Sequence, residues 1–277
     1  MDHDPPKSLP LPYEPPRNDV YDKTLNMKKV YLLLFFVASM VAGFGQSSVK
    51  DSSVFSTLFY ATYSYQVPGG DMAKHFGNNS SIGGGILFKT RKNWLMGADG
   101  HYLFGGKVKN SGELLKNIST TDGNIIDANG MYAEVLFSER GYAMYARFGK
   151  MFPVLGPNPN SGPFILGSMG YLQHKIRIDN PNTVVPQIKG DYKKGYDRLA
   201  GGFSLSESIG YLYMGNVRWI NFMVALEYTQ AWTKSKRDYA FDMMKKDNSK
   251  YKDYFYGIRV AWFIPVYKRS PKDFYYY

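Results

Sequence analysis

Residues 55–66 read FSTLFYATYSYQ, and the character of their side chains alternates along the stretch. Successive side chains of a β-strand point to opposite faces, so the stretch predicts a strand with one aromatic face and one polar, uncharged face. A transmembrane β-barrel is built from such strands, because its outer face meets lipid and its lumen is polar. The aromatic or small positions are Phe55, Thr57, Phe59, Ala61, Tyr63 and Tyr65, and the polar face carries Ser56, Tyr60, Thr62, Ser64 and Gln66.

Similar runs recur along the chain, which makes nine in all, whereas bacterial single-chain barrels have an even number of strands. The further runs lie at residues 81–89, 94–104, 131–137, 142–152, 164–178, 203–214, 219–232 and 254–264. The connections alternate between short turns and long polar loops of the kind that outer-membrane barrels have. The pattern therefore predicts an all-β, antiparallel up-and-down barrel of eight strands, with residues 131–137 as part of an outer hairpin. Ten strands, with one hidden in a loop, is the alternative.

An apolar stretch at residues 30–44 follows Met27, Lys28 and Lys29 and precedes small residues. This order is typical of a secretory signal peptide at residues 27–45, cleaved before Gln46. A membrane-anchoring helix is the alternative. We expect residues 1–26 to be a disordered leader or a misplaced start, residues 46–54 to be periplasmic, residues 55–265 to form the barrel and residues 266–277 to be a periplasmic tail. The location predicted is the outer membrane of a Gram-negative bacterium.

The chain has 277 residues, no cysteine and a formal net charge of +11. Without cysteine there is neither a disulfide nor a thiolate site. Basic residues gather in the last outer loop, residues 233–253, where the phosphates of lipopolysaccharide would attract them. Nucleic acid is not an expected partner, because the aromatic side chains that would stack on bases are used on the lipid face. Outer-membrane lipid and lipopolysaccharide are the expected partners, and no cofactor is expected.

The lumen of an eight-stranded barrel is just wide enough to be filled by its own side chains. Charges of both signs are expected there, and buried charges must pair. We expect these residues to form a salt-bridge network in the lumen. The alternative is that they line a gated path for protons or ions. The expected inward polar residues are Asp99, His101, Arg147, Lys175, Arg177, Glu227 and Arg259, together with Tyr145 and Gln173.

The last predicted strand carries a pattern that resembles the C-terminal recognition signal of outer-membrane barrels, a glycine followed by two outward hydrophobic residues. Its residues are Phe255, Gly257, Val260 and Trp262. Pro265 is expected to end the strand, because proline cannot donate to the ladder. The chain then ends in Phe274, Tyr275, Tyr276 and Tyr277, which predict either an interfacial aromatic anchor or a docking peptide for a periplasmic partner.

Two segments, residues 152–178 and 267–271, resemble a group of small outer-membrane β-barrels of Bacteroidota, in the eight-stranded OmpA/OmpX-like class. The first contains the sequence PVLGPNPNSG at residues 153–162 and QHKIRI at residues 173–178, and the second precedes the tyrosine tail. The resemblance implies the fold and the membrane but supplies no active site. Some small barrels of these bacteria are subunits of secretion or assembly machines, so a similar role is an expectation by analogy.

An enzyme that modifies lipid A is an alternative, since the strand parity predicts His174, Glu207 and Ser168 on the outer wall and a lipid-facing carboxylate is costly. A metal site has little support, because His75, His101 and His174 are expected on different faces. The leading expectation is therefore a non-enzymatic outer-membrane barrel with a filled lumen, acting as a structural or accessory subunit of a cell-envelope complex. A lipid A-modifying enzyme and a narrow channel are the alternatives.

Overall fold

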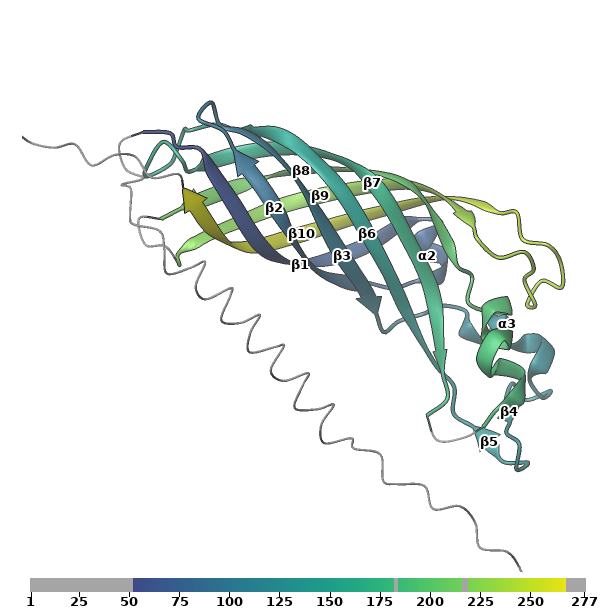
Figure 1. Ribbon diagram of the computed structural model, residues 1–277. Helices are drawn as coiled ribbons and strands as arrows, with labels where there is room; N and C mark the ends of the chain where they lie inside the picture. Colours follow the sequence, from purple (N-terminus) through teal and green to yellow (C-terminus); the bar gives the residue numbers. More distant parts are fainter. Residues whose placement is uncertain (1–51, 182–183, 216–218, 268–277) are drawn as a thin grey trace, which may run out of the picture. The chain divides into compact units, whose positions relative to one another are not determined.

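The structure is a computed structural model that describes residues 52–181, 184–215 and 219–267 (Figure 1). The chain divides into two units, Met1–Gly45 and Gln46–Tyr277, and all described residues belong to the second. The expected signal peptide, the leader before it and the four aromatic residues of the tail lie outside the described residues.

Eight long strands form one closed barrel in which neighbours are antiparallel (Figure 1). Their order around the barrel is β1-β10-β9-β8-β7-β6-β3-β2, so each strand pairs with its neighbours along the chain and the first strand pairs with the last. The predicted eight-stranded up-and-down barrel is confirmed. The strands are β1 (Ser56–Gly70), β2 (Asn79–Lys89), β3 (Trp94–Gly105), β6 (Leu136–Met151), β7 (Gly162–Asp179), β8 (Ala200–Met214), β9 (Asn221–Ser235) and β10 (Lys250–Tyr267).

The expectation that Pro265 ends the last strand is wrong, because β10 continues to Tyr267. Pro265 pairs with Leu58 of β1, whereas the pairing of β10 with β9 stops at Trp262. A proline is tolerated at the edge of a sheet, where its missing N–H removes no bond to a second neighbour. At Pro265, β10 has only β1 beside it, so the strand tolerates the proline.

The connections differ between the two ends of the barrel, as Figure 1 shows. At one end, here called the turn end, β2 is joined to β3, β6 to β7 and β8 to β9 by connections whose described residues form no helix or strand. At the other, the loop end, the connections contain the short helices α2 (Met72–His75) and α3 (Ser111–Leu114) and a small hairpin of β4 (Ile125–Ile126) and β5 (Tyr132–Ala133). Residues 131–137 therefore contain β5 of this hairpin and the beginning of β6.

The outer wall of the barrel is apolar at mid-height and aromatic toward both ends. Met144, Ile209 and Leu226, in the middle of their strands, are each more than 60% exposed. Aromatic side chains stack on the wall across neighbouring strands, with ring centroids 5.2 Å apart for Trp94 and Phe148 and 6.2 Å apart for Phe203 and Trp232. An apolar band between aromatic girdles is the surface of a barrel that lies in lipid. Among the described residues, no helix is both long enough and apolar enough to cross a membrane.

The interior has three levels along the barrel axis. Apolar side chains that include Leu58, Phe164 and Phe263 form a cluster toward the turn end. A second apolar cluster lies at the loop end, where strand residues such as Leu172 and Phe255 pack with loop residues. Charged side chains occupy the level between the two clusters, so both the polar middle and the outer mouth are enclosed.

Candidate functional site

Four charged side chains from four strands meet in the middle of the lumen. Arg147 of β6 donates from Nε to Asp99 Oδ2 of β3 at 2.5 Å, and Arg259 of β10 donates from Nη2 to Glu227 Oε2 of β9 at 2.6 Å. Arg147 also reaches Glu227 Oε1 at 3.4 Å, which joins the two pairs into one network. None of the four side chains is more than 3% exposed. Two carboxylates and two guanidinium groups cancel in formal charge, which a buried set requires.

Neutral groups complete this network. Tyr60 of β1 donates its hydroxyl to Asp99 Oδ2 at 2.7 Å, and Ser206 of β8 donates to Glu227 Oε1 at 3.0 Å. His101 Nε2 lies 3.1 Å from the same Asp99 oxygen. A neighbouring cavity of 10 Å³, which touches His101 and Gln66, offers room for about one water. Side chains therefore occupy the lumen at this height.

The structure brings five of the seven expected lumenal residues together and leaves two outside. Asp99, His101, Arg147, Glu227 and Arg259 share the network described above. Lys175 and Arg177 are exposed on the outer wall of β7, so their predicted inward orientation is wrong. The inward positions of this strand at the loop end belong to Ile176 and Ile178, which pack into the apolar cluster beneath the loops.

This phase error of one residue in β7 also breaks up the proposed catalytic set on the outer wall. Ser168 and His174 are buried inside the barrel, where Ser168 accepts a hydrogen bond from Arg147 Nη1 at 3.2 Å. Glu207 does point outward, as expected. A sheet separates Glu207 from the other two side chains, so the Ser, His and Glu set does not form.

A buried cation near the turn end was not identified from the sequence. Lys89, at the end of β2, is fully buried and donates to Asn160 Oδ1 at 2.8 Å and to Ser53 Oγ at 3.1 Å. Asn160 also accepts from the backbone N–H of Val54 at 3.0 Å. Lys89 therefore holds the chain just before β1 against the connection between β6 and β7. Its acceptors in these bonds are neutral oxygens.

The loops at the other end are tied to one another across the mouth of the barrel. Arg237 donates to both carboxylate oxygens of Asp197, at 2.8 and 2.5 Å, and Arg198 donates from Nε to Asp242 at 3.1 Å. Asn117 adds a bond of 2.7 Å to the backbone oxygen of Phe241. Apolar residues of the same loops, among them Leu114, Val185, Ile188 and Tyr196, are buried in the cluster at this end.

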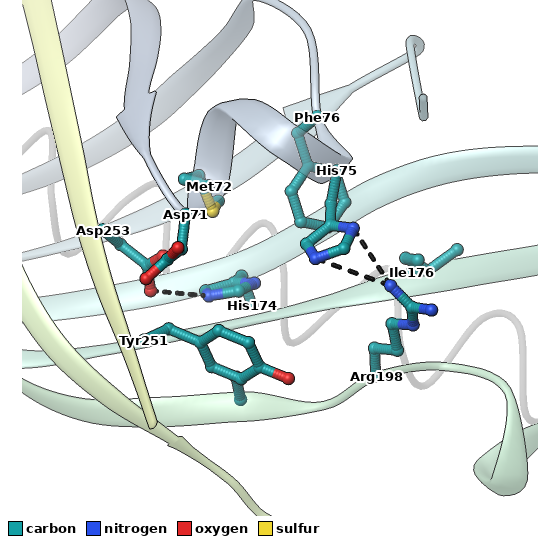
Figure 2. A pocket seen from close by; sticks show the side chains of 10 residues that line it. Asp71, Met72, His75, Phe76, His174, Ile176, Arg198, Tyr251 and Asp253 are labelled. Carbon is teal, nitrogen blue, oxygen red and sulfur yellow. Dashed lines mark hydrogen bonds and ion pairs between the residues drawn. The ribbon is translucent and has the colours of Figure 1, made fainter. Parts of the chain in front are cut away.

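Helix α2 contributes to a small polar pocket at the mouth (Figure 2). Arg198 donates from Nη1 to Nδ1 of His75 at 3.0 Å, and His174 Nε2 lies 3.2 Å from Asp253 Oδ2 (Figure 2). Burial, together with the nearby Arg198 guanidinium, lowers the pKa of His75. The open volume of 10 Å³ is about that of one water, so the pocket leaves no space for a larger ligand. The pairing of His174 with Asp253 had no counterpart in the sequence analysis.

The residues of the expected assembly signal divide between the two faces of β10. Phe255 is buried in the lumen, whereas Val260 and Trp262 are exposed on the outer wall. The two outward hydrophobic residues thus lie two positions apart on the lipid side. The docking residues Phe274, Tyr275, Tyr276 and Tyr277 lie outside the described residues. No group of three or more potential ligands that could hold a metal ion occurs within the described parts of the chain.

No family model matches the chain, and no curated protein matches its sequence. Among solved structures it is similar to Ail, the attachment invasion locus protein of Yersinia pestis, which was also determined in complex with the heparin analogue sucrose octasulfate. In that complex the identity is 12% and the TM-score 0.37, and the match covers 76% of this chain and 99% of Ail.

Two further structures show a similar degree of likeness. Neisserial surface protein A is 9% identical with a TM-score of 0.37, over 74% of this chain and 96% of that one. The outer membrane protein OprG from Pseudomonas aeruginosa is 12% identical with a TM-score of 0.36, over 79% and 99% of the two chains. These low values assign neither a family nor a function to the chain.

Proposed function

We propose that this chain is a non-enzymatic integral protein of a Gram-negative outer membrane, and that it acts as a structural or accessory subunit of a cell-envelope complex. The observation that carries the proposal is the closure of the barrel. A charge-balanced network fills the lumen at mid-height, and packed loops cover its outer mouth. A barrel closed in this way has its accessible surfaces on the outer wall and the loops, where it can contact lipid and other proteins.

The outer wall supports the membrane location. Its apolar band between aromatic girdles matches the chemistry of a lipid bilayer rather than that of water. The loop end lies toward the cell exterior, because long loops face outward in such barrels and short turns face the periplasm. Lys234 and Lys252, exposed at the loop end of β9 and β10, would then lie near the phosphates of the outer leaflet.

The hairpin of β4 and β5 supports a role in a complex. Ile126, Met131 and Tyr132 of this hairpin are 43%, 67% and 70% exposed, and they project from the polar loops at the outer end. Apolar side chains grouped in this way commonly mark protein contacts. We assign the contact with a partner protein to this hairpin.

Density-gradient fractionation and co-purification test the proposal. The protein is expected in the outer-membrane fraction, and proteins that purify with it from native membranes are expected to be lost from the double variant Met131→Ser/Tyr132→Ser. The variant Tyr192→Ser is the matched control, because Tyr192 is 63% exposed on a different loop. A wild-type protein that purifies without envelope partners would sink the subunit role.

Planar-bilayer recording tests the closure. The purified barrel is expected to remain non-conducting, because side chains fill its lumen at mid-height and packed loops cover its mouth. Steady single-channel conductance from the wild-type protein would replace the proposal with a channel function. Mass spectrometry of lipid A from a deletion strain tests the absence of lipid-modifying activity, and a changed lipid A mass would contradict it.

A further inference from the structure

Three cations lie on the outer wall where β6 and β7 approach the loop end. Arg140 and Lys175 are paired across these two strands, and Arg177 is the next outward residue of β7. Arg177 forms an ion pair of 2.7 Å with Asp179, with side chains 52% and 40% exposed. Within the described residues, no carboxylate lies within ion-pair distance of Arg140 or Lys175. The group thus has an uncompensated charge of +2, next to an outer hollow of 410 Å³.

Aromatic residues fix the height of these cations relative to the membrane. Tyr142 and Tyr171 both donate to Gln173 Oε1, at 3.1 and 3.2 Å, on the outer wall of the same two strands. Tyrosines of this kind form the girdle at the boundary between hydrocarbon and headgroups. Arg140 lies one outward position beyond Tyr142 and Lys175 lies two beyond Tyr171, both on the loop side. They are therefore placed at the level of the lipid headgroups.

Below the girdle, the same wall is recessed. A shallow, open hollow of 800 Å³ lies on the outer surface of β2, β3, β6 and β7, and apolar side chains such as Ile86, Met144 and Met169 line it. The wall is recessed there because several of the residues that line it are glycine or alanine, which have little or no side chain. Gly100 is one of them. Tyr171 and Met144 at its upper edge are the next outward residues after Gln173 and Tyr142. The hollow and the cationic group are thus successive parts of one surface.

We propose that this face binds a phosphate-bearing lipid of the outer leaflet, whose phosphate contacts Arg140, Lys175 and Arg177 and whose acyl chain lies in the hollow. The charge complementarity favours this occupant. Arginine donates to phosphate in a bidentate manner, and such charged bonds are stronger than neutral ones. An acyl chain fits a recess that is apolar and faces hydrocarbon. The site rests on the membrane location proposed above.

The cationic half of the site is tested by binding of diphosphoryl lipid A to the purified full-length barrel in dodecylmaltoside micelles, measured by native mass spectrometry. Arg140→Gln/Lys175→Gln/Arg177→Gln is expected to weaken binding by about tenfold or more, because charged hydrogen bonds to phosphate are lost. Arg91→Gln/Lys92→Gln/Lys150→Gln is the matched control, since it removes the same charge from the turn end of the barrel. An equal loss in both variants, or none in the first, overturns the site.

The apolar half has its own pair of variants. A Cβ added at Gly100 meets only the Ala143 carbonyl oxygen, at 3.9 Å, so Gly100→Leu fills part of the hollow without displacing the backbone. It is expected to weaken binding of diphosphoryl lipid A by about tenfold, since each methylene group of an acyl chain that the hollow buries contributes to the binding free energy. Gly167→Leu is the control, because its Cβ is equally free, at 3.8 Å from Phe148 oxygen, and lies outside the hollow. Unchanged binding by Gly100→Leu overturns the assignment of an acyl chain.

Two further readouts separate the possible reasons for failure. Inorganic phosphate is expected to compete only weakly with lipid A, and competition at equal concentration would show a site for free phosphate instead. The electrophoretic migration of unheated samples of each variant in detergent gels reports whether its barrel is folded. Absence of lipid A binding by a wild-type protein that is found in the outer-membrane fraction overturns this site alone, whereas absence of the wild-type protein from that fraction overturns the proposed location.

Discussion

The middle of the lumen and its turn end both bury charge, but they neutralise it in different ways. In the middle, two arginines and two carboxylates from four strands face one another, and strand register alone places them. At the turn end, Lys89 depends on Asn160 and Ser53, which belong to a connection and to the segment before β1. Removing one member of the mid-lumen network should therefore cost more stability than removing Lys89. Within the described part of the chain, no carboxylate forms an ion pair with Lys89, so removing this lysine leaves none of them unpaired.

Glu227→Gln should have the largest effect. Both Arg147 and Arg259 donate to Glu227, so the variant leaves an excess positive charge among buried side chains. We expect a loss of about 3–5 kcal/mol in the free energy of unfolding. Urea unfolding in lipid vesicles measures this, with Glu207→Gln on the outer wall as the control. A change as small as that of the control would mean that water reaches the network.

A double replacement should restore part of this loss. Glu227→Leu/Arg259→Leu removes one charge of each sign and leaves Arg147 paired with Asp99. The double variant should be more stable than Glu227→Leu alone by at least about 1 kcal/mol, because an apolar pair avoids the buried unpaired charge. The same unfolding assay provides the comparison. Additive losses from the two changes would contradict direct coupling.

Lys89→Met should have a smaller effect. The variant loses hydrogen bonds to neutral oxygens but also avoids burying an ammonium group, so a change below about 1.5 kcal/mol is expected. Asn160 keeps its bond from the N–H of Val54. Proteolysis of the segment before β1, compared with that of wild type, reports any local loosening. A loss as large as that of Glu227→Gln would remove the contrast between the two regions.

The smallest effect concerns the mouth and depends on pH. His75 has a lowered pKa in the folded mouth, so its neutral form is favoured there. Above pH 6.5, histidine is neutral whether α2 is docked or released, and stability does not change. As the pH falls below 6.5, only the released form gains the proton, and the docked form loses relative stability until its own pKa is passed.

Hydrogen exchange of the Phe76 amide, which bonds to Met72 oxygen, should report this change as faster opening at pH 5.5 than at pH 7.5, after correction for intrinsic rates. His75→Gln should remove the difference. Asp71, His174, Asp253 and Arg198 also face this histidine, and a pH dependence that survives in the variant would assign the effect to them.

The barrel was predictable because lipid imposes one rule on every strand over most of its length. Apolar and aromatic side chains point outward and polar ones inward, and this alternation gave the inward positions of Asp99, Arg147, Glu227 and Arg259. It gave nine runs, and the even strand number of such barrels, together with the lengths of the connections, reduced them to the eight strands found. The inward part of the rule fails at both ends of the barrel, where the interior is apolar, and at the loop end this apolar core is also covered by loops. There Ile176 points inward and Lys175 outward, so the rule reversed the phase of β7.

The interactions between loops could not be predicted for a different reason. His75 and Arg198 lie far apart in the sequence, as do Lys89 and Asn160, and strand alternation says nothing about connections. Only the folded chain brings these residues together. The buried position of Lys89 also gave no warning, because a lysine at the end of a strand ordinarily lies in water.

The pairing of β1 with β10 affects the folding of the barrel as well as its stability. Fifteen residue pairs join the first strand to the last, so one side of β1 has no backbone partner until the final strand has been synthesised. Folding that depends on contacts between distant parts of a chain is slow, and open strand edges invite wrong pairing. An incomplete chain therefore has two unpaired edges rather than a smaller stable barrel, and a cell must keep the chain unfolded until both ends can be joined.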